Sequence, residues 1–269
     1  MRCLSCRKRL PNRRGGLAIA VLLLKLAGPL QSWGSSSRFA ERGTEHEPTK
    51  SGVVGLLAAA LGRYRTDPVD DLAALRFGVR IDQPGTFLSD FQTEHKRKWD
   101  SQSARWVSGD ALPLTRRHYL ADAVFVAAFE GDGELLQRCA EALDAPAFPL
   151  FLGRRSCPPA CRVHIGLFED VTLLQALRNH PWEASERYQG NWKFHGKESV
   201  DLEILYDKQG SDEGEGYDVS LRDVPISFSQ EHRQYSFRTV AHTTATVRNP
   251  KYVGAQADHD PWSALGKEE

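Results

Sequence analysis

Residues 26–62 read LAGPLQSWGSSSRFAERGTEHEPTKSGVVGLLAAALG, and this stretch decides both the fold and the candidate site. Residues 27–34 end an apolar strand in a turn that carries Trp33. Residues 48–57 open an apolar helix with Lys50 and the two hydroxyl residues Thr49 and Ser51. A helix N-terminus presents unpaired N–H groups and partial positive charge, so it can hold a phosphate. Together with a stackable ring and nearby cations, this helix start predicts binding of single-stranded nucleic acid.

The pattern of apolar residues predicts core elements in the order β-α-β-β-α-β. In chain order they are a buried strand at residues 17–26, a helix at 52–61, a half-buried strand at 75–82, a strongly apolar strand at 119–129, a helix at 133–143 and a short strand at 162–168. We expect Thr49 or Ser51 to cap the first helix and Asp132 to cap the second. This order is the ferredoxin-like arrangement, an α+β fold whose sheet is a common platform for RNA.

A long insertion, at about residues 83–118, separates the second and third predicted strands. A link of this length is far beyond an ordinary hairpin loop. The insertion combines cations with aromatic residues: Lys96, Arg97, Lys98, Trp99, Arg105, Trp106, Arg116 and Arg117. The simplest interpretation is a long basic β-hairpin with interleaved aromatic side chains.

The composition divides the chain into parts of different character. Residues 1–16 form a basic extension that is expected to be disordered, and residues 17–169 form the ferredoxin-like domain. Residues 170–269 form a smaller C-terminal region with mixed short elements. The elements expected there are a helix at 171–178, strands at 202–206 and 235–247, and an acidic Gly-rich loop at 210–216.

A third motif, FPLFLGRRSCP at residues 148–158, places two arginines and a hydroxyl directly after a glycine. Arg154, Arg155 and Ser156 can form a compact anion site, because guanidinium groups bind phosphate with paired hydrogen bonds. A salt-bridged structural turn is the alternative. Trp33 also has two interpretations, since a tryptophan after a strand can be a stacking platform or part of the core.

Composition limits the other functions. The formal net charge is zero, so nucleic-acid binding requires a local basic patch. An odd number of cysteines without a regular framework favours a reducing compartment, and hence a cytoplasmic protein. Cys3, Cys6, Cys157 and Cys161 could share a zinc ion, but unrelated thiols are the simpler interpretation, so no metal or cofactor is predicted. No apolar run approaches the ~18 residues of a membrane span.

Catalysis has weak support in the sequence. Thr49-Lys50-Ser51 resembles the end of a P-loop but lacks the two glycines that such a loop requires. RNA cleavage without metal needs a positioned base and acid, and the candidates are His46, His118 and Tyr64. No spacing brings any two of them together, so no catalytic residue is predicted.

The three motifs, in this order, resemble the Cas-five family of CRISPR-associated proteins, most closely its members in type I-E Cascade. The similarity runs from about residue 17 to about residue 168 and more loosely to the C-terminus. It implies an RRM-like domain of the RAMP superfamily, with the insertion as a thumb that contacts the guide and the backbone subunits. It also implies a non-catalytic subunit that caps the crRNA 5′ handle in antiviral defence. The implied partners are this crRNA, the backbone and large subunits and, through the assembled complex, target DNA.

The predicted RNA-binding residues come from all three motifs. They are Gln31, Ser32, Trp33, Gly34, Arg38, Arg42, Thr49, Lys50, Ser51, Arg154, Arg155 and Ser156. Two alternatives from other functional classes stay open. One is a metal-independent endoribonuclease that processes precursor crRNA, and the other is a protein scaffold that assembles without RNA.

Overall fold

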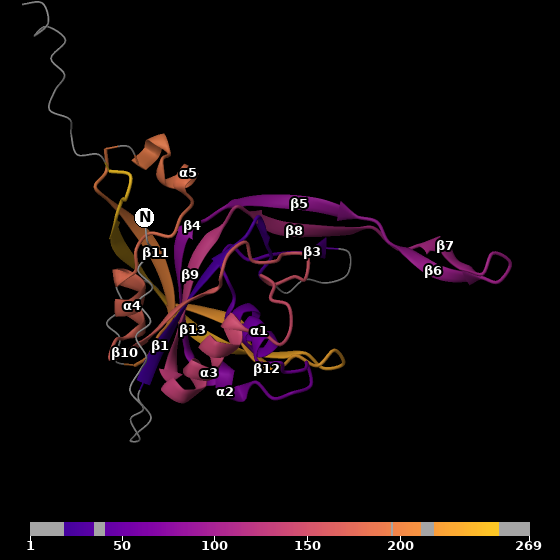
Figure 1. Cartoon of the computed structure of the whole chain (residues 1–269), viewed down its shortest axis with the longest axis horizontal. Coiled ribbons are helices and arrows are strands. Elements are labelled where there is room, and N and C mark those ends of the chain that lie inside the picture. The colour runs from indigo at the N-terminus through magenta and orange to yellow at the C-terminus, as the bar shows by residue number, and fades with distance from the viewer. Residues whose placement is uncertain (1–18, 35–40, 195, 211–217, 253–269) are drawn as a thin grey trace, which may run out of the picture.

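The computed structural model describes residues 19–34, 41–194, 196–210 and 218–252, and it shows a mixed α+β fold with several sheets (Figure 1). The largest sheet has seven strands in the order β10-β1-β9-β4-β11-β13-β12, and every pair is antiparallel. Its strands are β1 (Ile19–Ala27), β4 (Arg76–Gln83), β9 (Val124–Asp132), β10 (His164–Glu169), β11 (Ser199–Asp207), β12 (Val219–Ser227) and β13 (Gln234–Arg248).

Helices cover both faces of this sheet. They are α1 (Lys50–Ala60), α2 (Asp70–Ala74), α3 (Gly133–Asp144), α4 (Leu173–Asn179) and α5 (Glu186–Gln189), with a short 3-10 helix at Trp192–Phe194. Side chains alternate between the faces of β1, so Leu22 and Leu24 pack in the core beneath α1 and α3. Val21 and Leu23 pack in a second core beneath α4. This burial on both faces explains why β1 is a nearly continuous apolar run.

The predicted core elements occur in the predicted order, as β1, α1, β4, β9, α3 and β10. Thr49 caps α1, because its Oγ1 accepts a hydrogen bond from Gly52 N at 3.3 Å. Asp132 caps α3 by accepting from Glu134 N at 3.2 Å. The expected basic extension at residues 1–16 lies outside the described residues.

The apolar strand predicted at residues 119–129 is two strands. β8 (Thr115–Ala121) ends before Asp122, which has a φ of 57°, and β9 begins at Val124. Gly85, just before β5, packs against this turn, because a Cβ there would lie 2.6 Å from the Ala121 carbonyl oxygen. The prediction of one continuous strand was wrong because apolar character alone does not reveal a chain that changes sheets.

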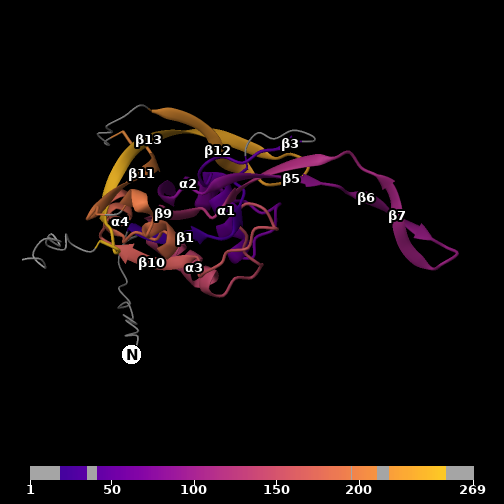
Figure 2. The same ribbon diagram turned by 90° about the horizontal axis from the view of Figure 1, so that it is seen from above.

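The insertion forms a β-hairpin that projects from the body, as Figures 1 and 2 show. At its base β5 (Thr86–Gln92) pairs with β8, and at its tip β6 (His95–Asp100) pairs with β7 (Arg105–Ala111). We call these four strands the thumb. Two short strands of the body, β2 (Leu30–Gln31) and β3 (Glu41–Arg42), also pair with β8. The first sequence motif is thereby connected to the base of the thumb.

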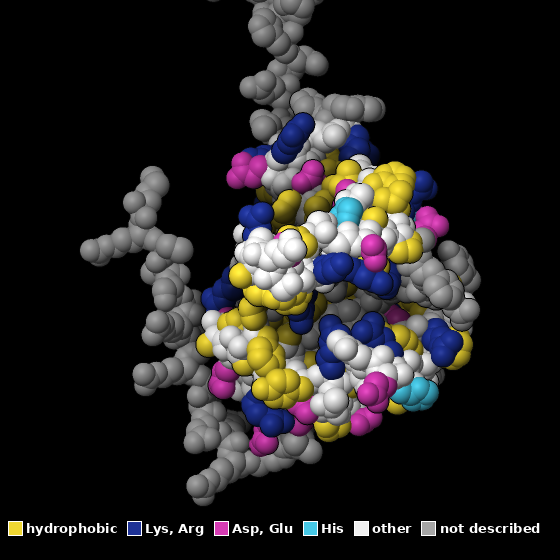
Figure 3. Space-filling model, turned by 90° about the vertical axis from the view of Figure 1, so that its right-hand side faces the viewer, with side chains coloured by type: hydrophobic (Ala, Val, Ile, Leu, Met, Phe, Trp, Pro, Cys, Tyr) yellow, Lys and Arg dark blue, Asp and Glu magenta, His cyan; other side chains and the backbone are white. Residues whose placement is uncertain are grey.

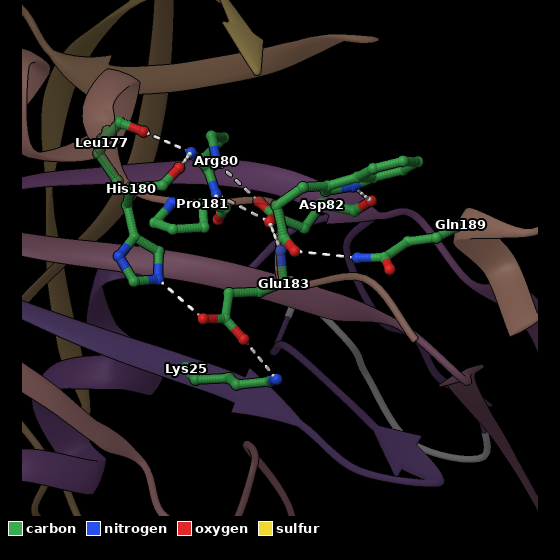
Figure 4. A network of polar contacts seen from close by, with 9 residues as sticks. Lys25, Arg80, Asp82, Leu177, His180, Pro181, Glu183 and Gln189 are labelled. Atoms are coloured by element: carbon green, nitrogen blue, oxygen red, sulfur yellow. Dashed lines mark hydrogen bonds and ion pairs between the residues drawn. The ribbon is translucent and has the colours of Figure 1, made fainter. Parts of the chain in front are cut away.

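The expected half-buried character of β4 was wrong. Arg80 and Asp82 are buried, because α4 and β11 from the C-terminal region cover the strand. The Arg80 guanidinium pairs with both Asp82 oxygens, at 2.7 and 2.8 Å, and Arg80 Nη1 donates to the carbonyl oxygen of Leu177 at the end of α4 (Figure 4). The pair therefore holds the C-terminus of α4 on the sheet.

The C-terminal region extends the main sheet. The helix expected at 171–178 is α4, and the strands expected at 202–206 and 235–247 are β11 and β13. The sequence did not predict β12, which forms the far edge of the sheet. Most of the acidic loop expected at 210–216 lies outside the described residues. Among the described residues, no helix combines the length and the apolar character needed to cross a membrane.

Candidate nucleic-acid interface

The three sequence motifs meet in space around Trp33. A Cβ on Gly52 of α1 would lie 2.8 Å from the Trp33 ring. Gly153 has a φ of 84°, and a Cβ there would overlap the Ser32 carbonyl oxygen. Ser32 N also donates to the Leu152 carbonyl oxygen at 3.1 Å. Glycine is therefore required in the second and third motifs, because backbone and ring pack directly against it.

The side chain of Trp33 is part of the core. It is fully buried, and its Nε1 donates to Gln31 Oε1 at 3.1 Å. Gln31 is also buried and donates to the Leu26 and Ala123 carbonyl oxygens at 3.1 and 2.7 Å. The structure therefore favours the core interpretation of Trp33, and stacking of its ring on a base does not fit this arrangement. Buried Gln31 likewise stabilises the turn after β1 through these hydrogen bonds.

The predicted phosphate site at the start of α1 is occupied by the protein's own carboxylates. Lys50 is only 5% exposed, and its Nζ pairs with Asp207 Oδ2 at 2.9 Å. The Lys50 N–H donates to Asp223 Oδ2 at 2.7 Å. The helix N-terminus does bind an anion, as its dipole favours, but that anion comes from β12. A direct Lys50–phosphate contact is therefore incompatible with this structure.

Arg238 of β13 joins these two carboxylates. Its guanidinium donates to Asp223 at 2.6 and 2.8 Å and to Asp207 at 2.6 Å. Burial alone would lower the pKa of Arg238, but hydrogen bonding and the two negative charges outweigh it, so the pKa is raised. We call Lys50, Asp207, Asp223 and Arg238 the buried ion network. In the sequence this network corresponds to the acidic composition of residues 201–223.

Arg154 fixes the backbone at the base of the thumb. It donates to the carbonyl oxygens of His118, Arg42 and Gly43 at 3.1, 2.8 and 3.1 Å. Its guanidinium lies 4.9 Å from the centre of the Tyr119 ring. Arg154 therefore acts structurally, but its partners are carbonyl groups and a ring, and the salt bridge of the structural-turn alternative does not occur among the described residues.

Two arginines lie directly opposite each other beside Arg154. Arg42 of β3 pairs in register with Arg117 of β8 in a parallel ladder. Like charges in this position destabilise a sheet. Arg117 Nε is buried without a hydrogen-bond partner among the described residues, and the described carboxylates form no ion pair with either side chain. Asp90 of β5 is the register partner of Arg117 on its other side, but the two side chains form no ion pair. Neither guanidinium group is therefore neutralised by a carboxylate within the described part of the chain.

We call Arg42, Arg117, Arg154 and the exposed Arg155 the arginine cluster. Figure 3 shows that Lys and Arg side chains gather on the face toward which the thumb projects. Ser156 and Gly34 are exposed near it, whereas Ser32 is buried and donates to the His118 carbonyl oxygen at 3.1 Å. Thr49 is buried as the helix cap, Ser51 is half-buried, and Arg38 lies outside the described residues.

The thumb presents rings and cations to solvent. Trp99 and Trp106 are 50% and 58% exposed, and their ring centres lie 5.5 Å apart. The Arg116 guanidinium lies 4.7 Å from the centre of the Phe91 ring. Lys96, Arg97, Lys98 and Arg105 are exposed and have no ion pair with the described carboxylates. Phe87 and Phe91 are further exposed rings that we did not predict, although alternation along β5 would have marked them.

The acid–base candidates do not form one site. His118 Nε2 lies 3.1 Å from Glu41 Oε1, and the His46 ring packs edge-on against Phe87 at 4.6 Å. His46 precedes the N-terminus of α1, whereas Tyr64 follows its C-terminus and contacts Phe148. The two ends of α1 are about 16 Å apart along the helix axis, from ~1.5 Å of rise per residue.

The described residues contain no group of three or more side chains suited to a metal ion. Cys157 is buried, which raises the pKa of its thiol, and Cys161 is exposed. Cys3 and Cys6, the other half of the possible zinc site, lie outside the described residues.

Comparison with known proteins places this fold among CRISPR-associated proteins. The chain resembles a solved structure described as a Cas protein, with 35% identity and a TM-score of 0.58 over 87% of this chain and 97% of the other. It also resembles a chain of a CRISPR RNA-guided surveillance complex, with 31% identity and a TM-score of 0.65 over 91% and 97%.

Sequence comparison shows to which family of CRISPR-associated proteins the chain belongs. The family model for CRISPR-associated protein (Cas_Cas5) matches residues 21–241, and the chain therefore belongs to the Cas5 family. It is also 33% identical over 174 residues to the CRISPR system Cascade subunit CasD of Escherichia coli (strain K12), covering 59% of this chain and 76% of that protein. The family expected from the three motifs is confirmed.

Proposed function

We propose that this protein is a non-catalytic RNA-binding subunit of a type I-E CRISPR Cascade complex and that it holds the 5′ handle of the crRNA. Its body is then the ferredoxin-like domain of the RAMP superfamily, at residues 17–169, supported by residues 170–269. Its partners are the crRNA, the backbone and large subunits and, through the complex, target DNA. Its expected location is the cytoplasm.

The arginine cluster is the observation that carries this proposal. Arg42 is exposed, Arg117 lies opposite it, and the described carboxylates form no ion pair with either, so both charges are available to an external phosphate. Arginine binds phosphate with paired hydrogen bonds, and successive phosphates of one strand can bridge neighbouring guanidinium groups. Arg155 adds a further exposed cation. Single-stranded RNA supplies the phosphates in a continuous chain.

The thumb supports the same function from a second surface. Its exposed cations are interleaved with exposed rings, and such surfaces bind single strands by charge and stacking. In the proposed complex the thumb contacts the guide and the adjacent backbone subunit through Lys96, Arg97, Lys98, Trp99, Arg105, Trp106, Arg116 and Arg117.

Salt dependence of RNA affinity tests the proposal. We expect Arg42→Ala/Arg117→Ala to weaken binding of a handle RNA and to reduce the salt slope by about 0.7 for each phosphate of the single strand that the variant no longer neutralises. Arg187→Ala is the matched control, since Arg187 is an exposed arginine on α5. An unchanged slope in the double variant would remove the arginine cluster from the RNA site.

A metal-independent endoribonuclease is the second candidate, and the pair His118–Glu41 beside the cluster favours it. A histidine and a carboxylate can act as base and acid. Incubation of the purified chain with repeat RNA separates the two functions. The non-catalytic proposal expects intact RNA, whereas cleavage at the 5′ boundary of the handle that His118→Ala abolishes would establish the nuclease. Tight RNA-free assembly with the other subunits would instead favour the scaffold alternative.

A further inference from the structure

An exposed aromatic pair lies at the end of α1 that faces away from the arginine cluster. Tyr64 is 69% exposed and Phe148 is 36% exposed, and their ring centres lie 5.6 Å apart in an edge-on arrangement. They come from the loops that follow α1 and α3. The core clusters contain neither ring, so burial within this chain does not explain why two large rings are held here.

The backbone holds both rings in place. The N–H groups of Ala147 and Phe148 donate to the carbonyl oxygens of Ala60 and Ala59, at 3.0 and 3.2 Å. Tyr64 N donates to Asp67 Oδ2 at 2.8 Å, and Asp67 N donates to the Tyr64 carbonyl oxygen at 3.1 Å. The loop after α3 thereby satisfies two carbonyl groups at the C-terminus of α1. Since the backbone that carries the two rings is already fixed, little conformational entropy would be lost when a partner binds.

Carboxylates border the aromatic pair on one side. An open pocket next to Tyr64 is lined by Arg63, Asp67, Pro68, Asp70 and Asp71. Arg63 binds both oxygens of Asp71, and this hydrogen-bonded pair lowers the pKa of Asp71. Asp70 is exposed and has no ion-pair partner among the described residues. The pocket therefore retains an available negative charge.

We propose that Tyr64, Phe148 and the adjacent pocket form a docking surface for another protein, through a segment that presents an apolar side chain close to a lysine or arginine. The apolar side chain covers the two rings, and the cation reaches Asp70. Tyrosine and arginine are enriched in the residues that dominate binding energy, and exposed Arg65 lies beside Tyr64. Arg63 and Asp71 neutralise each other, and Asp67 and Asp70 together outweigh the single charge of Arg65. The remaining negative charge disfavours a phosphate backbone, so the occupant is a protein rather than RNA.

This surface is separate from the proposed RNA site, and the two can be tested independently. For the first test, p-benzoylphenylalanine replaces Tyr64 in the full chain, and the protein is irradiated in cells that express the CRISPR-associated subunits. The expected product is a covalent adduct with one identified protein, at a peptide with an apolar residue beside lysine or arginine. An adduct with RNA, an adduct with a second copy of this chain, or no adduct would overturn the proposal.

The second test measures the affinity of that identified partner. We expect Tyr64→Ala/Phe148→Ala to weaken partner binding by about 30-fold or more, which is the effect typical of interface hot spots. Asp70→Lys should weaken it as well, whereas the control Tyr64→Phe, which keeps the ring, should retain binding. Handle-RNA affinity should be unchanged in all three variants. Thermal unfolding should change little, with Asp70→Lys slightly less stable because Asp70 lies in the first turn of α2.

Two outcomes keep the docking surface and the RNA site distinguishable. Equal partner affinity in the double alanine variant and the unmodified protein would refute the docking surface. An unmodified protein that binds the partner but not handle RNA would refute only the proposed function.

Discussion

The start of α1 and the arginine cluster are both cationic, but only one of them is open. In the buried ion network, Lys50 and Arg238 are matched by Asp207 and Asp223 at hydrogen-bonding distances of 2.6 to 2.9 Å. In the arginine cluster, Arg42 and Arg117 lie side by side, and the described carboxylates form no ion pair with either of them. A cation that the protein itself neutralises stabilises the fold, and a cation left unpaired is available to a ligand.

The difference arises from chain segments far apart in sequence. Asp207 lies 157 residues from Lys50, and Asp223 lies 173 residues from it. Both reach α1 only because β11, β13 and β12 extend the main sheet beyond β4. Local sequence shows that Lys50 begins a helix, but it does not show which strand will cover that helix start.

Removal of Asp207 should have the largest effect on stability. The variant Asp207→Ala leaves Lys50 and Arg238 partly uncompensated in a buried site and also removes the acceptor of the Phe77 N–H, which lies 3.0 Å from Asp207 Oδ2. Breaking a buried ion pair costs about 3–5 kcal/mol. Urea unfolding measures the loss, with the exposed Asp218→Ala as control. A loss below about 1 kcal/mol would mean that the buried ion network does not hold the C-terminal strands on α1.

RNA affinity should depend on the arginine cluster and not on the buried ion network, which is the reverse of their effects on stability. Lys50→Met destabilises the protein but should leave the salt slope for handle RNA unchanged, because Lys50 is occupied by Asp207. Arg42→Ala/Arg117→Ala should reduce that slope by about 1.4, from ~0.7 for each phosphate. Fluorescence anisotropy at several salt concentrations measures both. A reduced slope in the Lys50 variant would restore the helix start to the RNA site and contradict the comparison.

Acid should remove the stabilisation that comes from Glu183 and its two partners, a third set of charges that is partly exposed. Glu183 accepts hydrogen bonds from His180 and from Lys25, and these interactions lower the pKa of Glu183 to about 2 (Figure 4). A lowered folded-state pKa adds stability that is complete above the ordinary glutamate pKa and is lost as the pH falls toward about 2. Solvent screening limits the contribution to about 1 kcal/mol.

The acid-dependent loss can be assigned with one variant. Glu183→Gln should remove about that part of the stability difference between pH 6 and pH 3 in urea unfolding, by the linkage between pKa and stability. An identical pH dependence in the variant and the unmodified protein would show that Glu183 carries none of it.

The sequence predicted the elements whose causes are local. Thr49 and Asp132 cap their helices as expected, and the basic hairpin occurs at the expected place. The errors concern burial, which depends on distant segments. Arg80 looked like an exposed residue of an alternating strand, and only the packing of α4 and β11 explains its burial. For the same reason Trp33 retained two interpretations, and Lys50 resembled a phosphate ligand.

The thumb tip should have the smallest effect on stability. Neither core cluster contains a residue of β6 or β7, and Figures 1 and 2 show the tip projecting away from the body. Replacement of residues 94–113 with Asn-Gly joins β5 to β8 through a two-residue turn that suits a hairpin. The unfolding free energy should change by less than about 0.5 kcal/mol, because the deletion removes no part of either core.

The same deletion separates the two roles of the thumb. The arginine cluster at its base stays intact, so binding of the isolated handle should persist, while assembly with the guide and the backbone subunit should fail because Trp99, Trp106 and the tip cations are gone. Urea unfolding, RNA affinity and co-purification of the complex give the three readouts. Unfolding of the deletion variant would show that the tip belongs to the folded core. Normal assembly would show that the tip makes no essential contact, and the functional surface would then be confined to the arginine cluster and the base of the thumb.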